Sequence, residues 1–276
     1  MWKYALMVSY RGSAYCGWQR QKRSLDKENP SVQDRIEKAV AQMTHEEVAV
    51  VGSGRTDSGV HAVGQVAHFI LREKKWDREI LQKGLNGILP ADIRILAVQS
   101  VSLSFHAQKS AEKKQYSYYF QQGACALPHL EPFSWWIRKT LDVKAMSTAL
   151  NTLVGEHDYK AFQASGARPG PTVRRILEAE VTFEEIPFPL NGVWVPPGEP
   201  SFGLIRVRLL GTGFLKQMVR GIAGTLLQIG EGRRPAACMA EILASQDRSA
   251  VGPTAPARAL WLERVWYPEN LTFVGG

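Results

Sequence analysis

The most constraining stretch of this chain is a glycine-rich segment between two apolar runs, residues 52–69, which reads GSGRTDSGVHAVGQVAHF. Three valines lie close together just before it, and from Val66 to Leu71 the side chains alternate as they do in a β-strand. Glycines permit the sharp backbone turns that join strands. The segment therefore predicts a strand, a tight turn and a second strand, with Arg55 and Asp57 on the turn.

Asp57 lies on this turn two residues after Arg55. Loops supported by a rigid scaffold often carry catalytic groups, so Asp57 is a candidate catalytic residue. Asp-Ser-Gly is also an ordinary turn sequence, in which the aspartate bonds to the backbone and the glycine supplies a positive φ angle. The turn by itself leaves both interpretations open.

Composition limits the class of protein. The chain has 276 residues, 45% of them hydrophobic, which is enough to bury the core of one large domain or two small ones. No apolar run approaches the roughly 20 residues that span a bilayer, and the N-terminus lacks the cleavage site of a signal peptide. The three cysteines are far apart and form no metal-ligand spacing. We expect a protein of the reducing cytoplasm with no structural metal.

The net charge of +8 and the sequence pI of about 9.4 suit a polyanionic partner. Solvated lysine faces are common, however, so charge alone does not establish nucleic-acid binding. Basic residues cluster at Arg20-Lys22-Arg23, Arg72-Lys74-Lys75, Lys109-Lys113-Lys114 and Arg174-Arg175.

Hydrophobic periodicity predicts an α+β protein in which strands and helices alternate along both halves. We expect strands near residues 3–10, 47–53, 63–71, 92–103, 115–122, 173–184, 202–210 and 259–267. We expect helices near residues 31–43, 77–86, 142–153, 214–229 and 235–244, with Gly87 as the C-cap of the second. The predicted domain division is 1–110, which carries Asp57, and 111–276.

Other segments could hold the bases of a nucleic acid. Residues 10–21, YRGSAYCGWQRQ, combine aromatic, glycine and amide groups of the kind that hold unstacked bases, although Tyr15 and Trp18 could instead cover the edge of the core. Tyr116 and Tyr118 share one strand face, where packing is the alternative to stacking on a base. Arg220 lies at the edge of the apolar stripe of its helix, where it can reach a cleft or only solvent.

Taken together, these segments resemble the TruA-type tRNA pseudouridine synthase family over almost the full length of the chain. Their order and spacing agree as well as their residues. The matching segments are SYRGSAYCGWQRQ, SVQDRIEKA, GSGRTDSGVHAVGQV, LNGILPADIRI, SFHAQKSAEKKQYSYYF, TVRRI, GTGFLKQMVRGIAGTLLQIGEG and APARALWL.

The resemblance implies the pseudouridine synthase fold, with two ferredoxin-like (RRM-like) subdomains, a joined and largely antiparallel sheet, and a central basic cleft. It implies isomerisation of uridine to pseudouridine in the anticodon stem-loop of tRNA, at positions 38, 39 and 40, without cofactor or metal. It also implies a homodimer, for which the apolar helix near residues 214–229 could supply a partner face.

The resemblance also assigns roles to residues. Asp57 matches the catalytic aspartate and Arg55 the arginine that displaces the target base. Tyr116 matches the tyrosine that packs against that base, Arg220 the arginine paired with the aspartate, and Leu260 an apolar residue of the base pocket. The residues that we expect to bind RNA phosphates are Arg20, Lys22, Lys113, Lys114 and Arg174.

The chain departs from the family pattern at Ser58, where alanine is general, at Gln108 and Gln163, where arginine is expected, and at Lys109, where phenylalanine is common. These departures leave open which nucleotides are contacted. Two other functions remain as alternatives: a tRNA-binding protein that assists folding without catalysis, and a nucleoside hydrolase that uses Asp57. The sequence also leaves open whether Asp57 attacks C1′ or C6 of the nucleotide or removes a sugar proton.

Overall fold

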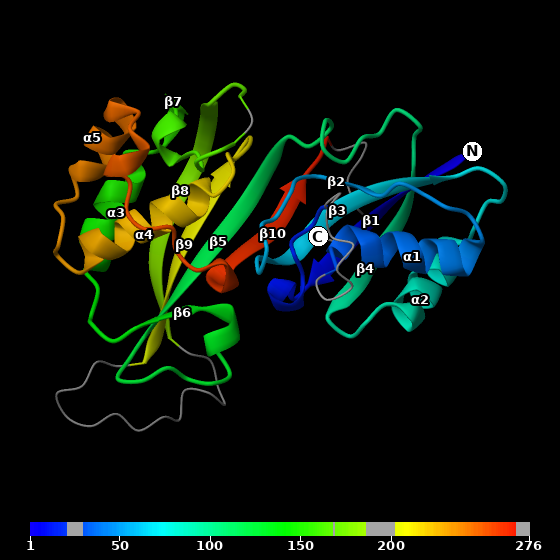
Figure 1. The fold of residues 1–276 in the computed structure, drawn as a ribbon, viewed down its shortest axis with the longest axis horizontal. Helices are drawn as coiled ribbons and strands as arrows, with labels where there is room; N and C mark the ends of the chain where they lie inside the picture. Colours follow the sequence, from blue (N-terminus) through cyan, green and yellow to red (C-terminus); the bar gives the residue numbers. More distant parts are fainter. Residues whose placement is uncertain (21–29, 168, 186–201, 269–276) are drawn as a thin grey trace. The chain divides into compact units, whose positions relative to one another are not determined.

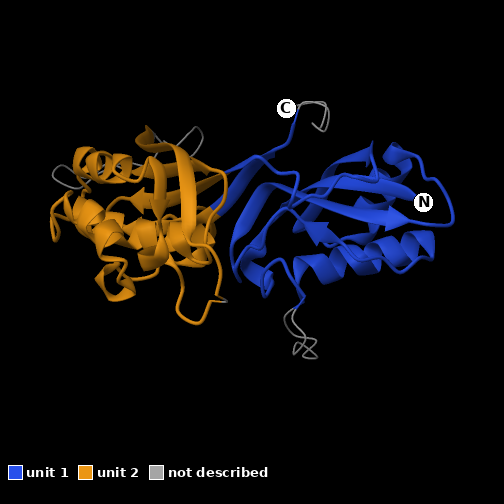
Figure 2. Cartoon of the chain, turned by 90° about the horizontal axis from the view of Figure 1, so that it is seen from above, with its two compact units in different colours: residues 1–114, 261–276 blue, residues 115–260 orange. Residues whose placement is uncertain are grey.

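The computed structural model describes residues 1–20, 30–167, 169–185 and 202–268, and the chain divides into two compact units. Unit 1 comprises residues 1–114 and 261–276, and unit 2 comprises residues 115–260 (Figure 2). The sequence had assigned residues 261–276 to the C-terminal domain. They belong to unit 1 because the last strand pairs with a strand of that unit, at Trp261 opposite His61 and Leu262 opposite Ala62.

Unit 1 is an antiparallel sheet with two helices and one added parallel strand. Its strand order is β4-β1-β3-β10, with the short β2 paired to β3. β1 runs antiparallel to β3 and β4, whereas β10 runs parallel to β3. The elements are β1 (Trp2–Tyr10), α1 (Val32–Thr44), β2 (Val51–Gly52), β3 (His61–Leu71), α2 (Arg78–Ile88), β4 (Ile93–Val101) and β10 (Leu260–Trp266).

Helices α1 and α2 contact each other and bury their apolar stripes (Figure 1). Ile36 and Val40 of α1 and Leu81 and Leu85 of α2 are fully buried. The Ser31 side chain caps α1 by accepting a hydrogen bond from the backbone N–H of Asp34. The 3.6-residue spacing of these apolar positions is therefore what directs both helices into the core of the unit.

Unit 2 combines a set of paired strands with three helices. Its strand order is β5-β9-β8-β7, with β6 parallel to β5 and β8 antiparallel to both β7 and β9. Helix α3 packs against β8 and α4. The elements are β5 (Lys113–Gln122), β6 (Trp135–Ile137), α3 (Val143–Asn151), β7 (Gly155–Asp158), β8 (Val173–Glu185), β9 (Gly203–Gly211), α4 (Met218–Gly230) and α5 (Cys238–Ser245).

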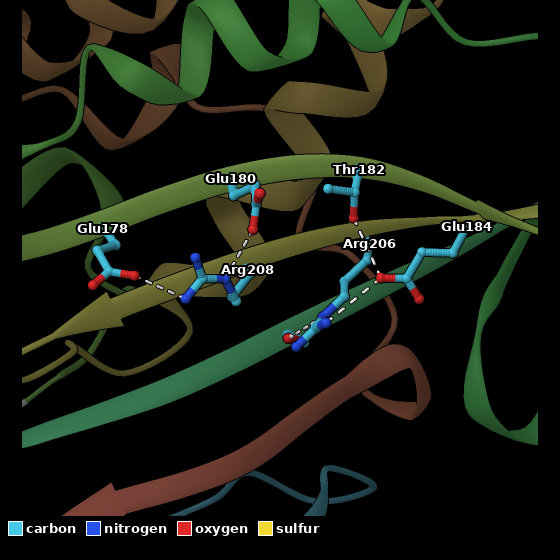
Figure 3. Close-up of polar contacts among 7 residues, drawn as sticks. Glu178, Glu180, Thr182, Glu184, Arg206 and Arg208 are labelled. Carbon is cyan, nitrogen blue, oxygen red and sulfur yellow. Dashed lines mark hydrogen bonds and ion pairs between the residues drawn. The ribbon is translucent and has the colours of Figure 1, made fainter.

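An ion-pair ladder connects one face of β8 to the same face of β9 (Figure 3). Arg208 pairs with Glu178 at 2.9 Å and with Glu180 at 3.0 Å, and Arg206 pairs with Glu184 at 3.5 Å. Three carboxylates thus balance two guanidinium groups on this face. Arg206 and Arg208 therefore add little to the positive charge that the protein can offer to a polyanionic partner.

The mixed, mostly antiparallel arrangement confirms the expected α+β class, while the ferredoxin-like character of each half stays a prediction. Two helix ends were predicted wrongly. Gly87 lies inside α2, which ends at Ile88 because Pro90 favours an extended conformation at the C-cap residue, Leu89. The fourth helix begins at Met218 rather than near residue 214, because Gln217 adopts a left-handed conformation with φ 60°.

Three more differences concern short elements. The strand expected at residues 47–53 is paired only at Val51 and Gly52, and α5 begins at Cys238 rather than near residue 235. The sequence also missed the short strands β6 and β7. Lys22 and the Pro- and Gly-rich loop at residues 187–200 lie outside the described residues.

Candidate active site

The Asp57 turn, residues 53–60, joins β2 to β3 as predicted and is fixed at its first residues by a buried polar network. Ser53 and Gln65 are fully buried. The Ser53 hydroxyl donates to Gln65 Oε1 at 2.6 Å, and Gln65 Nε2 donates to the Gly54 carbonyl at 3.0 Å. The Ser53 N–H also donates to the Val66 carbonyl at 2.7 Å. A buried network with these partners satisfied rigidifies the backbone that it joins.

The middle of the Asp57 turn is held at Thr56. Its hydroxyl is hydrogen-bonded to that of Tyr10 at 2.8 Å, and its carbonyl accepts from the Trp18 N–H at 3.1 Å. Burial raises the pKa of Tyr10 to about 12, so its hydroxyl stays protonated at neutral pH and remains a partner for Thr56. The residue directly before Asp57 is thus bound through both side chain and backbone.

The loop at residues 12–18 packs against the Asp57 turn at Thr56 and Ser58. The Ser58 hydroxyl donates to the Tyr15 carbonyl at 3.1 Å, which gives this departure from the family pattern a structural role. Gly17 has φ 108°, and a Cβ at this position would lie 2.6 Å from the Thr56 carbonyl oxygen. Glycine is therefore needed at residue 17 both for its backbone angle and for the close approach to the turn.

The aromatic residues of this loop are structural. Tyr15 is 4% exposed and Trp18 is 3% exposed, and the Tyr15 hydroxyl donates to Asp92 Oδ1 at 2.5 Å. The Trp18 ring lies close to the Cα of Gly52 and 5.9 Å from the ring of Tyr10. Of the two interpretations of residues 10–21, the structure favours covering the edge of the core over stacking on a base.

The two candidate residues on the turn are accessible from solvent. Arg55 is exposed and Asp57 is half-buried, whereas Thr56 between them is buried. A carboxylate on a rigid backbone, open on one side, can act as a nucleophile or as a base without a costly rearrangement. Asp57 therefore has the placement that a catalytic carboxylate needs.

Lys114 approaches the Asp57 turn from β5. Its ammonium donates to the Ser53 carbonyl oxygen at 2.6 Å, and burial lowers the pKa of Lys114 to about 8. The neighbouring Lys113 places its ammonium 5.3 Å from the centre of the Trp266 ring. Both lysines were expected to bind phosphates, but the structure shows each in contact with the protein itself.

The other expected RNA contacts lie at the surface. Arg20 is exposed, and its Nη1 lies 3.7 Å from the Glu37 carboxylate. Arg174 donates from Nη1 to the carbonyls of Pro171 at 2.9 Å and Val173 at 2.7 Å. Their binding of RNA stays a prediction.

Unit 2 carries the remaining three candidates. Tyr116 is 8% exposed, and the edge of its ring meets that of Phe214 with the ring centres 5.1 Å apart. Arg220 donates from Nε to the Ala255 carbonyl at 2.7 Å, and the Ala255 N–H donates back to the Arg220 carbonyl at 3.2 Å. Leu260 is buried at the start of β10. Tyr118, on the same strand face as Tyr116, is a fully buried core residue.

Residues 251–256, which lead toward Leu260, are fixed against the glycine-rich face of α4. A Cβ on Gly224 would overlap the Pro253 carbonyl, and the Gly252 N–H donates to Thr225 Oγ1 at 3.0 Å. The Tyr118 hydroxyl donates to the Pro256 carbonyl at 3.0 Å. The glycines spaced along α4 are a sequence signal for this close backbone packing.

Neither a membrane helix nor a metal cluster appears in the described parts of the chain. Among the described residues, no group of three or more His, Cys, Asp or Glu side chains could hold a metal ion. Within the same residues, no helix is long and apolar enough to cross a bilayer.

Comparison with known proteins decides the family. A family model described as tRNA pseudouridine synthase matches residues 6–108 and 149–268. The chain belongs to the tRNA pseudouridine synthase family. It is 37% identical to tRNA pseudouridine synthase A of Bdellovibrio bacteriovorus, covering 98% of this chain and 96% of that protein. It is 38% identical to the enzyme of the same name from Ruminiclostridium cellulolyticum, covering 97% of this chain and 100% of that protein.

Three departures from the family pattern lie away from the Asp57 turn in the sequence of this synthase. Gln108 and Lys109 are exposed, and their N–H groups donate to His106 Nδ1 at 3.2 and 3.3 Å. Gln163 follows a short 3₁₀ helix at Lys160–Phe162. None of the three takes part in the hydrogen bonds described above that fix the turn.

Proposed function

We propose that this synthase converts uridine to pseudouridine in the anticodon stem-loop of tRNA, with Asp57 as the catalytic nucleophile and without a cofactor. The observation that carries the proposal is the half-buried Asp57 carboxylate on a turn that is hydrogen-bonded on both sides of it. The full-length similarity to enzymes named tRNA pseudouridine synthase A supports tRNA as the substrate.

The chemistry requires an ionised carboxylate near the sugar or base. The C1′–N1 bond breaks, the uracil turns, and a C1′–C5 bond forms while the C5 proton moves to N1, so the product is an isomer of the substrate. An aspartate can attack covalently or remove a proton, and both uses require its ionised form. The fixed turn supports this role because the carboxylate need not be reoriented during the reaction.

The target nucleotide must leave the stacked stem before Asp57 can reach it. Turning a nucleotide out costs a few kcal/mol in unstacking, which contacts with the enzyme must offset. The exposed side chain of Arg55, two residues before Asp57, suits entry into the space that the base leaves. We assign Tyr116 to packing on the base, Arg220 to supporting the carboxylate, and Leu260 to the base pocket, as the resemblance implies.

Positive charge supplies the affinity for the RNA backbone. The net charge of +8 favours phosphate contacts that do not depend on base sequence. We assign these contacts to exposed or half-exposed side chains such as Arg20 and Arg174 rather than to Arg206 and Arg208, which are paired with glutamates. We further propose a homodimer acting in the cytoplasm.

The proposal is tested by mapping pseudouridine in tRNA from cells that lack this chain, using carbodiimide-dependent stops of reverse transcription. We expect the stops in the anticodon arm to disappear, and to return with the wild-type chain but not with Asp57→Ala. Anticodon arms that are unchanged in the deletion strain would refute the substrate assignment. Release of free uracil by the purified protein would instead favour a nucleoside hydrolase.

A further inference from the structure

Lys114 contacts the Asp57 turn at its main chain. Its Nζ donates to the Ser53 carbonyl oxygen at 2.6 Å. A Cβ built on Gly54 would lie 3.1 Å from the same Nζ, so the ammonium lies close over the Gly54 backbone. The side chain is half-buried in this position. A charged donor to a backbone carbonyl makes a stronger hydrogen bond than a neutral one.

The contact completes the support of the turn. Lys114 binds the carbonyl of Ser53, and Gln65 binds the next carbonyl, that of Gly54. Thr56 and Ser58, which flank Asp57, are bound by other residues. Lys114 and Gln65 therefore determine where the backbone enters the turn, three to four residues before Asp57.

We propose that Lys114 is a positioning residue, whose ammonium holds the Ser53–Gly54 end of the turn so that the Asp57 carboxylate meets the target nucleotide in the reactive geometry. The proposal rests on the catalytic role proposed for Asp57. It replaces the expectation that Lys114 binds a phosphate of the RNA.

Burial of the Lys114 ammonium makes its contact with the turn depend on pH. Burial alone lowers the pKa of Lys114 to about 8, below its usual value of 10.5. The folded protein therefore releases this proton more readily than the unfolded chain, so the burial penalty is fully present below pH 8. It is relieved as the pH rises from about 8 to 10.5.

The titration also predicts how the reaction depends on pH. The charged or titratable groups on the elements around Lys114 are Arg55 and Asp57 on the turn, Lys113 beside it on β5, and Tyr267 after β10, whose pKa burial raises. None of them is among the causes of the lowered pKa of Lys114. Loss of the Lys114 proton weakens its bond to Ser53, so kcat/KM should fall as the pH rises through about 8.

The test compares Lys114→Met and Lys114→Arg with a charge control, Lys83→Met, which removes an exposed lysine of α2. Single-turnover rate, tRNA affinity and thermal midpoint are measured for each purified full-length variant. For Lys114→Met we expect a rate about 10- to 100-fold lower. We expect its tRNA affinity to stay within about threefold and its thermal midpoint within about 3 °C of wild type. Lys83→Met should match the wild type in rate and thermal midpoint.

Lys114→Arg keeps a permanent charge and should recover part of the rate while moving the alkaline fall in kcat/KM to higher pH. If Lys114→Met fails to fold, the pH profile of Lys114→Arg still tests the proposal. A fall in kcat/KM at the same alkaline pH as in the wild type overturns it. A rate of Lys114→Met within twofold of the wild type also overturns it. If Lys114→Met binds tRNA more weakly but keeps the wild-type single-turnover rate, the proposal is overturned and Lys114 binds a phosphate instead.

The role of Asp57 is tested in parallel with Asp57→Ala. Full activity in Asp57→Ala refutes the proposed function itself. An inactive Asp57→Ala together with a fully active Lys114→Met refutes only the inference about Lys114.

Discussion

Gly17→Ala should move the Asp57 turn, although residue 17 is 40 positions earlier in the chain. Gly17 has φ 108°, and a Cβ there would lie 2.6 Å from the Thr56 carbonyl oxygen and 3.1 Å from the Asp57 carbonyl carbon. Both neighbours are backbone atoms, which cannot rotate away as the end of a side chain can. The turn or the loop at residues 12–18 must therefore shift.

Two effects determine how much Gly17→Ala lowers the free energy of unfolding. An L-residue held at such a φ angle costs roughly 1–3 kcal/mol. Relieving the overlap by a backbone shift adds about 1–3 kcal/mol. A sum near 4 kcal/mol should lower the thermal midpoint by about 12 °C. A shift of the turn by about 1 Å should lower kcat by roughly 100-fold, because the carboxylate leaves its reactive position.

The control is Gly232→Ala. Gly232 also has a positive φ, 71°, but no atom lies within 4 Å of a Cβ built there. It should cost only about 1 kcal/mol and leave kcat unchanged. The assay is calorimetry together with kcat for pseudouridine formation. If Gly17→Ala loses no more stability or activity than Gly232→Ala, the packing of Gly17 does not position Asp57.

Three further predictions concern single groups. Tyr10→Phe removes the hydroxyl partner of Thr56 and should lower the free energy of unfolding in urea by about 1–3 kcal/mol. It should also lower kcat, and an unchanged kcat would contradict the role of Thr56 in positioning Asp57. Burial is the main cause that lowers the pKa of His68 to about 4. The free energy of unfolding should therefore fall by about 1–2 kcal/mol, after solvent screening, as the pH drops from about 6.5 to 4. A His68→Gln variant should lose less over this range, and an equal loss would contradict the assignment. Arg174→Gln should reduce the slope of log tRNA affinity against log salt concentration by about one unit. Arg208→Gln removes a cation that is already paired with two glutamates, so it should change this slope far less. Equal slopes for the two variants would contradict the assignment of phosphate contacts.

The Asp57 turn could be predicted because its signals are local. Glycines punctuate the segment, and the alternation from Val66 to Leu71 marks the strand that follows. The structure confirms strands on both sides of the turn. The groups that fix the turn could not be predicted in this way, because Tyr10 and Trp18 lie about 40 residues earlier and Lys114 more than 50 residues later. Hydrophobic periodicity reports which face of an element is buried and carries no information about such distant partners.

Other errors have similar physical causes. The apolar stripe of α4 begins at Leu215, so periodicity extended the helix over residues that form a loop before Gln217. The final strand was assigned to the C-terminal half because the sequence does not show that β10 pairs with β3. In the sequence, Lys114 is one of several basic residues. Only the structure shows that its ammonium donates to the backbone carbonyl of Ser53.

The central claim is that the Asp57 carboxylate performs the chemistry. It is tested most directly by the single-turnover release of tritium from uracil C5 in tRNA, with Asp57→Asn in place of the wild type. The amide keeps the size of the side chain and one acceptor oxygen but is neither a nucleophile nor a base. We predict a loss of at least about 1000-fold in rate with tRNA binding retained. Tritium release at a rate close to that of the wild type would contradict the account.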